Sequence, residues 1–398
     1  SWRTVAARYG FVEYDGPTLE SVELYAKKNE SGAEILQQLY QFPDKGGRQV
    51  ALRPEMTPTL ARMVAARERQ YRKPLKWFSI ASFFRYERQQ KGRLREFIQL
   101  NCDLIGDAGS GADAEVVALA VDLMRELGFG SGDFVVRISD RRAWMAFLAA
   151  KGVPAEHMGL VLQAADKLER EPAESLDAKL APAGISVADL QAFIAAGSPE
   201  AFAPLLDDLR ARGLGDFVEV DLSIVRGLAY YTGVVFEIFD RSKAMRALAG
   251  GGRYDDLIKG LSDGASDLPA IGFGMGDVVL GNFIDAVPRA AERLRQHLAA
   301  GGCDIYVVIA DEARRAEALG VVQTLRNAGL RVEYALSAAK VGKQFQTAES
   351  LGASLAAVVG QEWPAVKIKT LATRQEEEVS HTELADWLQK RQKDAQPQ

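Results

Sequence analysis

The chain has 398 residues, enough for roughly two or three domains with cores of their own. Its hydrophobic share of 47% and charged share of 26% are ordinary for a soluble globular protein. The formal net charge of −5 argues against a general polyanion binder, although a local basic patch on an acidic protein is compatible with nucleic acid. No apolar run approaches the roughly 20 residues of a membrane span, so no membrane partner is expected.

The two cysteines, Cys102 and Cys303, lie far apart, each within an apolar, strand-like run. This pattern favours buried thiols in a reducing compartment over a disulfide, and we expect a cytoplasmic protein. The three histidines, His157, His297 and His381, are scattered along the chain, so no metal site is predicted.

The first part of the chain mixes helices with strands. Residues 1–20 predict a helix and a short strand, and RQVALRPEMTPTLARMVAAR predicts a strand, a turn with proline and a helix. A polar loop separates two predicted strands, LKWFSIASFFRYER and EFIQLNCDLIG. An acidic start, apolar positions at helical spacing and a glycine end predict an amphipathic helix in DAEVVALAVDLMRELGFG, which the strand DFVVRISD follows.

The composition then changes twice. Residues from about 143 to 215 lose β character and predict a helical insertion, after which strands return over 216–240. AIGFGMGDVVLGNFI then predicts a strand or a turn that leads into a helix. We therefore expect one domain over 1–285, a linker helix over 286–300 and a second domain over 301–398. In the second domain strands alternate with helices, which is typical of a small α/β fold.

Polar side chains recur at every second position of the second predicted strand, at Gln99, Asn101 and Asp103. Alternate residues of a strand share a face, so these three point one way together with Phe97. If the faces of the two strands coincide, Arg85, Glu87, Gln99 and Asp103 line one surface. A solvated sheet is the plainer interpretation, but it leaves Phe83 and Phe97 open to water, so we favour a binding site.

The loop between these strands is basic, with Arg88, Lys91, Arg93 and Arg95. Guanidinium groups suit phosphate oxygens, so ATP phosphates or an RNA end would fit here. A solvated turn explains the same residues without any ligand.

Three further clusters are candidates for the site. In IVRGLAYYTGVVFE, Arg226 stands in an apolar run before Tyr230 and Tyr231 and needs an anion, which is either a ligand or a structural carboxylate. In AGGGRYDDL, glycines 250–252 precede Arg253 and Tyr254, and glycines allow close backbone approach to a ligand or simply form a turn. In LRPEMTPTLAR, a turn presents Glu55 before Thr57, where a carboxylate would suit an amino group.

Together these segments resemble the histidyl-tRNA synthetases, which are class II aminoacyl-tRNA synthetases. FRYERQQKGRLREF resembles class II motif 2, and VRGLAYYTGVVFE and GGGRYD resemble the two histidine-specific motifs. The resemblance runs along the whole chain, and the last domain looks like the family's anticodon-binding domain. It implies an α+β fold: an antiparallel catalytic sheet of six or seven strands with a helical insertion, plus a C-terminal α/β domain.

The resemblance also implies residue roles. Arg85 and Arg226 would be catalytic, each placing positive charge at the α-phosphate of ATP. The implied ATP-binding residues are Arg85, Glu87, Arg93, Gly274 and Gly276. The implied histidine-binding residues are Glu55, Thr57, Gln99, Asp103, Tyr230, Tyr231, Gly251, Arg253 and Tyr254.

The implied reaction is the activation of histidine with ATP, followed by transfer of histidine to the 3′ end of tRNA(His). Mg²⁺ would accompany ATP, no metal site of protein ligands is implied, and family members are homodimers. Three alternatives share parts of the pattern: a regulatory subunit of ATP phosphoribosyltransferase, a non-catalytic sensor of tRNA or histidine, and a class II enzyme of another specificity, which motif 2 fits but the two histidine motifs do not.

The chain departs from the family pattern at four positions. Val279 stands where motif 3 usually has an arginine for the γ-phosphate, and Ala229, Gln89 and Ile98 replace the commoner acid, proline and histidine. The first departure is the best support for a non-catalytic sensor. If the chain is an enzyme, we expect Arg226 or a basic loop residue, Arg88 or Arg93, to compensate.

Overall fold

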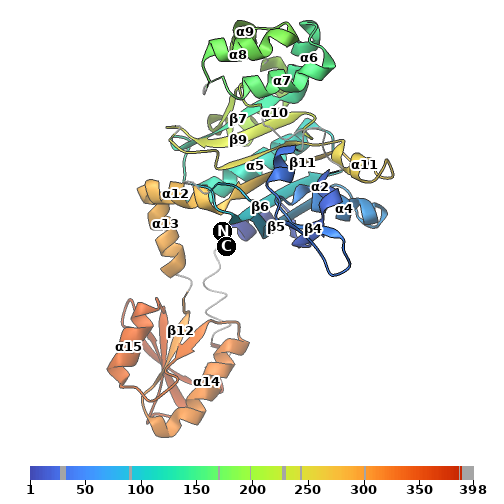
Figure 1. The fold of residues 1–398 in the computed structure, drawn as a ribbon. Coiled ribbons are helices and arrows are strands. Elements are labelled where there is room, and N and C mark those ends of the chain that lie inside the picture. Colours follow the sequence, from blue (N-terminus) through green and yellow to red (C-terminus); the bar gives the residue numbers. More distant parts are fainter. Residues whose placement is uncertain are drawn as a thin grey trace. The chain divides into compact units, whose positions relative to one another are not determined.

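The computed structural model describes residues 1–26, 33–88, 92–168, 171–197, 199–225, 230–242, 244–299, 302–384 and 386–387. The chain forms two compact units, Ser1–Ala290 and Ala291–Gln398 (Figure 1). In the described residues, no helix has both the length and the apolar character needed to cross a membrane.

An eight-stranded sheet organises the first unit, in the order β1-β5-β6-β11-β10-β9-β7-β8. The six inner strands pair antiparallel throughout, whereas the short edge strands β1 and β8 pair parallel to their neighbours. In sheet order the strands are β1 (Val12–Glu13), β5 (Leu75–Phe84), β6 (Glu96–Ile105), β11 (Ala270–Gly276), β10 (Ala249–Arg253), β9 (Val234–Asp240), β7 (Phe134–Asp140) and β8 (Val218–Val220).

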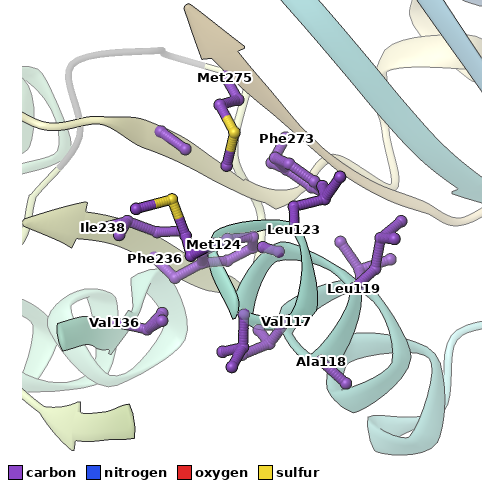
Figure 2. Packing of buried hydrophobic residues seen from close by; sticks show 14 of the residues in the cluster. Val117, Ala118, Leu119, Leu123, Met124, Val136, Phe236, Ile238, Phe273 and Met275 are labelled. Atoms are coloured by element: carbon purple, nitrogen blue, oxygen red, sulfur yellow. The ribbon is translucent and has the colours of Figure 1, made fainter. Parts of the chain in front are cut away.

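One face of this sheet carries the main core. Helix α5 (Ser110–Glu126) lies across it, and Figure 2 shows Leu119, Leu123 and Met124 of this helix among side chains from β11, β9 and β7. The helix ends before Gly128, whose φ of 95° is a conformation that glycine adopts without strain. Helices α1 (Trp2–Arg8) and α12 (Asp277–Ala286) add to the same core.

The other face is covered only in part. Helices α4 (Thr57–Arg67) and α11 (Leu257–Leu261) pack on it, with Leu60 and Ile258 fully buried. Pro58 in the first turn of α4 suits a helix start, because the amide that proline lacks would have no partner there. A second small sheet precedes α4, in the order β2 (Leu19–Ser21), β4 (Gln49–Leu52) and β3 (Gln41–Pro43), with α2 (Val22–Ala26) and α3 (Ala33–Gln37) between its strands.

A group of helices between β7 and β8 forms the insertion: α6 (Arg141–Ala150), α7 (Ala155–Ala165), α8 (Ala173–Leu180), α9 (Val187–Ala196) and α10 (Pro199–Ala211). Most of them share a separate core around Trp144 and Leu176, while α10 packs against α5. The Trp144 indole donates a buried hydrogen bond of 2.9 Å to the carbonyl of Leu222, which joins the insertion to the sheet unit.

Helix α13 (Pro288–Ala299) spans the division between the units. The second unit has a mixed five-stranded sheet with α14 (Arg315–Asn327) and α15 (Val341–Ser350) on opposite sides (Figure 1). Alternate residues of β12 (Ile305–Ile309) face the two helices, since Val307 packs with α14 and Val308 packs with α15. The strand order is β13 (Val332–Tyr334), β12 (Ile305–Ile309), β14 (Leu355–Val359), β15 (Ala365–Thr370) and β16 (Glu376–Ser380).

Both cysteines are buried and unpaired, as their sequence context predicts. Cys102 points into the main core from β6, and Cys303 lies in the core of the second unit. The large sheet has eight strands, where six or seven were expected. Both edge strands, β1 and β8, lie within segments for which the sequence predicts strands.

Candidate active site

The paired strands β5 and β6 bring the polar and aromatic side chains onto one face. Ala81 lies opposite Gln99, and Phe83 lies opposite Phe97. Residues directly opposite in an antiparallel pair share a face, so the alternation predicted from the sequence is present in the structure. Leu100 and Cys102 point the other way into the main core.

The neighbouring strand β11 carries glycines on that same face. Gly272 pairs with Asp103, Gly274 with Asn101 and Gly276 with Gln99. A Cβ at Gly272 would overlap the Asp103 carboxylate, and one at Gly274 would approach the Gln99 amide to about 2.6 Å. Glycines therefore make the room in which the β6 side chains lie across β11.

A small hollow of about 70 Å³ lies over this floor. Tyr230 donates a hydrogen bond of 3.1 Å to the Glu55 carboxylate within it. Burial, and then the nearby negative charge of Glu55, raise the pKa of the Tyr230 phenol well above its ordinary value, so the phenol stays protonated. The residues that line the small hollow are Glu55, Thr57, Arg85, Gln99, Asn101, Tyr230, Tyr231, Tyr254, Phe273, Gly250, Gly272 and Gly274.

Asp103 lies beneath this hollow rather than in its lining. Asp103 is 2% exposed, and its carboxylate accepts a hydrogen bond of 2.6 Å from Tyr254, which does line the hollow. Burial raises the pKa of Asp103 to about 7, and the hydrogen bond from Tyr254 opposes that rise. Asp103 therefore influences the small hollow indirectly, by holding the ring of Tyr254 in position.

A large hollow of about 280 Å³ adjoins the small one. Arg85, Gln99, Gly250 and Gly274 line both, so the two form a continuous depression. The Arg85 guanidinium donates a 3.0 Å hydrogen bond to the carbonyl of Pro54 and lies 5.3 Å from the centroid of the Phe97 ring. It is thereby held at the point where the hollows meet.

The rest of the large hollow is rich in charge and glycine. Arg93 forms an ion pair of 2.6 Å with Glu87, and the Asp277 carboxylate accepts a 3.2 Å hydrogen bond from the backbone of Ile98. Beyond the shared residues, the lining consists of Glu87, Gly92, Arg93, Leu94, Phe97, Arg246, Ala247, Leu248, Ala249, Gly276, Asp277, Val278 and Val279.

Besides Asp103, two expected histidine-binding residues line neither hollow, namely Gly251 and Arg253. They share a face of β10 that points toward α5, whereas Gly250 faces the depression. The Arg253 guanidinium is 2% exposed and pairs with Asp113 of α5 at 2.6 Å. The position of Arg253 thus differs from the one that its implied role in histidine binding requires, because strand alternation turns its side chain to the opposite side of the sheet.

The structure brings most of the other predicted residues together. Glu55, Thr57, Tyr230, Tyr231 and Tyr254 line the small hollow; Glu87, Arg93 and Gly276 line the large one; Arg85, Gln99 and Gly274 line both. Arg226 and Ala229, with Gln89 and Lys91, lie outside the described residues.

Sequence reasoning missed two charged residues of the large hollow, Arg246 and Asp277. Asp277 directly follows Gly276, which was a usable signal for its position. Arg246 lies in a polar connection between strands, where nothing in the local pattern distinguishes it from a solvated residue.

The described residues contain no group of three or more histidine, cysteine, aspartate or glutamate side chains able to hold a metal ion. Glu87 and Asp277 are the carboxylates that line the large hollow.

Comparison with known proteins gives two family matches. Residues 2–276 match the histidyl-tRNA synthetase family, and residues 285–391 match the anticodon binding domain. The chain is 44% identical over 412 residues to the histidine–tRNA ligase of Opitutus terrae, covering 96% of this chain and 91% of the relative. It is 39% identical over 399 residues to the histidine–tRNA ligase of Natronomonas pharaonis, covering 94% and 90%.

A crystal structure of histidyl-tRNA synthetase from Nostoc sp. has a similar fold, with a TM-score of 0.70 at 23% identity, over 98% of this chain and 94% of that one. The α+β fold class expected from the motifs is therefore confirmed. With a family match over most of the first unit and close relatives along nearly the whole length, the chain belongs to the histidyl-tRNA synthetase family.

Proposed function

We infer that the chain is a histidine–tRNA ligase, an enzyme that joins histidine to tRNA(His) at the expense of ATP. Besides the family, one observation carries this inference: the Arg85 guanidinium borders a small polar hollow and a large cationic one at once. A reaction between an amino acid and a nucleoside triphosphate needs the two bound side by side, with positive charge where they meet.

The small hollow suits histidine. The Glu55 carboxylate, next to the Thr57 hydroxyl, would pair with the α-ammonium group, and Gln99 would hold the carboxylate end. The O–H group of Tyr230 donates its hydrogen bond to Glu55, so the lone pairs of the phenol oxygen are available to accept a hydrogen bond from an imidazole N–H. Tyr231 and Tyr254 would border the ring, with Asp103 holding Tyr254 in place.

The large hollow suits ATP, with its phosphates reaching Arg85. In the first step a carboxylate oxygen of histidine attacks the α-phosphorus, and the bond from that phosphorus to the oxygen bridging the α- and β-phosphates breaks. Histidyl-adenylate forms and pyrophosphate leaves. Arg85 would stabilise the charge that builds on the α-phosphate, and we propose the same role for Arg226.

Glu87, Arg93, Gly274 and Gly276 are the further proposed ATP contacts. Mg²⁺ would neutralise part of the triphosphate charge, and its coordination by phosphate oxygens with one or two carboxylates fits a hollow that contains Glu87 and Asp277.

In the second step a terminal ribose hydroxyl of the tRNA attacks the carbonyl carbon of the adenylate. The ester bond forms, the bond from that carbon to the phosphate oxygen breaks, AMP leaves, and the hydroxyl proton is released. Residues 285–391, which match an anticodon binding domain, would recognise the other end of the tRNA. We also propose a cytoplasmic homodimer with the first helix and strand in its interface, which sedimentation of the purified protein would test.

Histidine-dependent exchange of labelled pyrophosphate into ATP tests the first step, and charging of tRNA(His) tests the second. We expect both activities. Histidine binding without exchange would instead indicate a sensor, and absence of both binding and exchange would contradict the proposed function.

A further inference from the structure

Arg246 is a cation of the large hollow to which no role has been given. It lies in the connection between β9 and β10 and lines the hollow together with Val279 of α12. Val279 occupies the position at which the sequence comparison with class II motif 3 leads one to expect a phosphate-binding arginine. Besides Arg85 and Arg93, the hollow thus contains a third arginine, which the connection between β9 and β10 carries.

The connection that carries Arg246 is held in place by a buried anion. Asp240, at the end of β9, is 2% exposed. Its two carboxylate oxygens accept hydrogen bonds of 2.9 Å from the backbone amides of Ala244 and Met245, and the Ser242 hydroxyl donates to it as well. The backbone just before Arg246 is therefore fixed from the strand end, and Met245 packs against the main core.

The position of Arg246 along the wall separates it from Arg85. The wall of the large hollow runs from Arg246 through Ala249 to Gly250, and Gly250 is shared with the small hollow. Arg246 thus stands four residues before the junction at which Arg85 is held. A segment of that length spans at most about 13 Å, which is within reach of a triphosphate whose α-phosphate lies at the junction.

The large hollow contains further charged residues besides Arg85 and Arg246. Arg93 pairs with Glu87, and Asp277 is held by the backbone of Ile98. Arg88, one of the residues expected to compensate for Val279, does not line the hollow. A triphosphate carries several negative charges, and Arg246 adds a guanidinium on the wall away from Arg85.

We propose that Arg246 binds the β- and γ-phosphates of ATP, and therefore also pyrophosphate, in place of the motif 3 arginine. The proposal rests on the proposed function, since it assigns a residue to the ATP side of the same reaction. Arg246 is a binding residue in this role, because the attack on the α-phosphorus takes place at Arg85.

The experiment compares the full-length wild-type protein with Arg246→Ala and Arg246→Lys by histidine-dependent pyrophosphate exchange. For Arg246→Ala, we expect the KM values for ATP and pyrophosphate to rise about tenfold to a hundredfold, the scale of a lost charge-assisted contact. The KM for histidine should not change. Inhibition by AMP, which lacks the terminal phosphates, should be as strong as in the wild type. The lysine variant should recover part of the loss.

Arg210→Ala is the matched control, because it removes an equally charged, exposed arginine from α10, away from both hollows. It should leave all four constants unchanged. Because Arg246 is exposed, its variants should melt at the wild-type temperature.

An unchanged ATP KM in Arg246→Ala overturns the proposal, as does an equal weakening of ATP and AMP, which would place the contact at the base or the α-phosphate. Absence of exchange in the wild-type protein would instead contradict the proposed function, so the two failures are distinguishable.

Discussion

The hydroxyl of Tyr254 donates a 2.6 Å hydrogen bond to the carboxylate of Asp103, across 151 positions of sequence. Both residues are buried, and only the tyrosine lines the small hollow. The position of the Tyr254 ring in the proposed histidine site therefore depends on the hydrogen bond with the Asp103 carboxylate beneath it.

The raised pKa of Asp103 leads us to expect that the stability of the folded protein depends on pH. Its pKa of about 7 in the folded protein exceeds the ordinary value of 3.8, because burial disfavours the charged form. Between these values the folded protein binds a proton that the unfolded chain has released. This contribution to stability is thus complete below pH 3.8 and is lost as the pH rises to about 7, by up to about 1.4 kcal/mol per pH unit.

The Asp103→Asn substitution should remove the loss of stability that accompanies a rise in pH, because asparagine does not titrate. We expect the free energy of unfolding to fall less from pH 5 to pH 8 in the variant than in the wild type, as measured by urea unfolding at both values. Tyr254→Phe should have the opposite effect, since it removes the hydrogen bond that holds the Asp103 pKa down. Identical pH profiles for all three proteins would show that Asp103 does not titrate in this range.

Gly272→Ala should damage the site and the fold together. Its Cβ would overlap the Asp103 carboxylate and approach the backbone of the paired strand β6. Overpacking of this kind costs about 1–3 kcal/mol, and the displaced carboxylate should release Tyr254 and raise the KM for histidine. The control is Gly281→Ala in α12, where a Cβ meets nothing within 4 Å and alanine favours the helix. Thermal melting and exchange kinetics would measure both effects, and a fully active, stable Gly272→Ala would contradict the described floor.

Tyr230→Phe should weaken histidine binding without weakening ATP binding. It removes the hydroxyl that donates to Glu55 and that we expect to accept from the imidazole. The KM for histidine should rise about three- to tenfold, the effect of one lost hydrogen bond. Tyr9→Phe is matched to it, since Tyr9 also donates to a carboxylate, that of Asp122, but outside both hollows. Equal histidine KM values in the two variants would count against the assignment.

Arg253→Ala should lower stability rather than specific affinity. Removing the guanidinium leaves Asp113 without its buried partner, a change that costs about 3–5 kcal/mol. We expect a strong fall in melting temperature, with the KM for histidine unchanged in the protein that stays folded. A variant that melts normally but has lost histidine affinity would restore Arg253 to the ligand contacts.

Much of the site follows from strand periodicity alone. Once β5 and β6 are paired, the two-residue repeat places Gln99 and the aromatic pair Phe83–Phe97 on one face, and no long-range information is needed. The family resemblance supplied the remaining segments, because local patterns do not show that Glu55 and Tyr230, 175 positions apart, share a hydrogen bond.

The positions of Arg253 and Arg246 could not be predicted from strand periodicity or from local sequence patterns. A run of glycines has no apolar and polar sides, so nothing in AGGGR reveals which residues face α5 and which face the ligand. The direction depends on how β10 pairs with β11 and β9, and that pairing is set by tertiary packing. Arg246 likewise acquires its neighbours only when α12 and the connection after β9 approach the same hollow.

The bare face of β11 has a consequence for redesign. Where a strand presents only hydrogens to a ligand, every substitution adds volume, so that side of the cavity can be narrowed but never widened. A variant that accepts a bulkier amino acid would have to gain its space by replacing the tyrosines that line the small hollow. The glycines of β11 would still limit the size of the amino acid that fits.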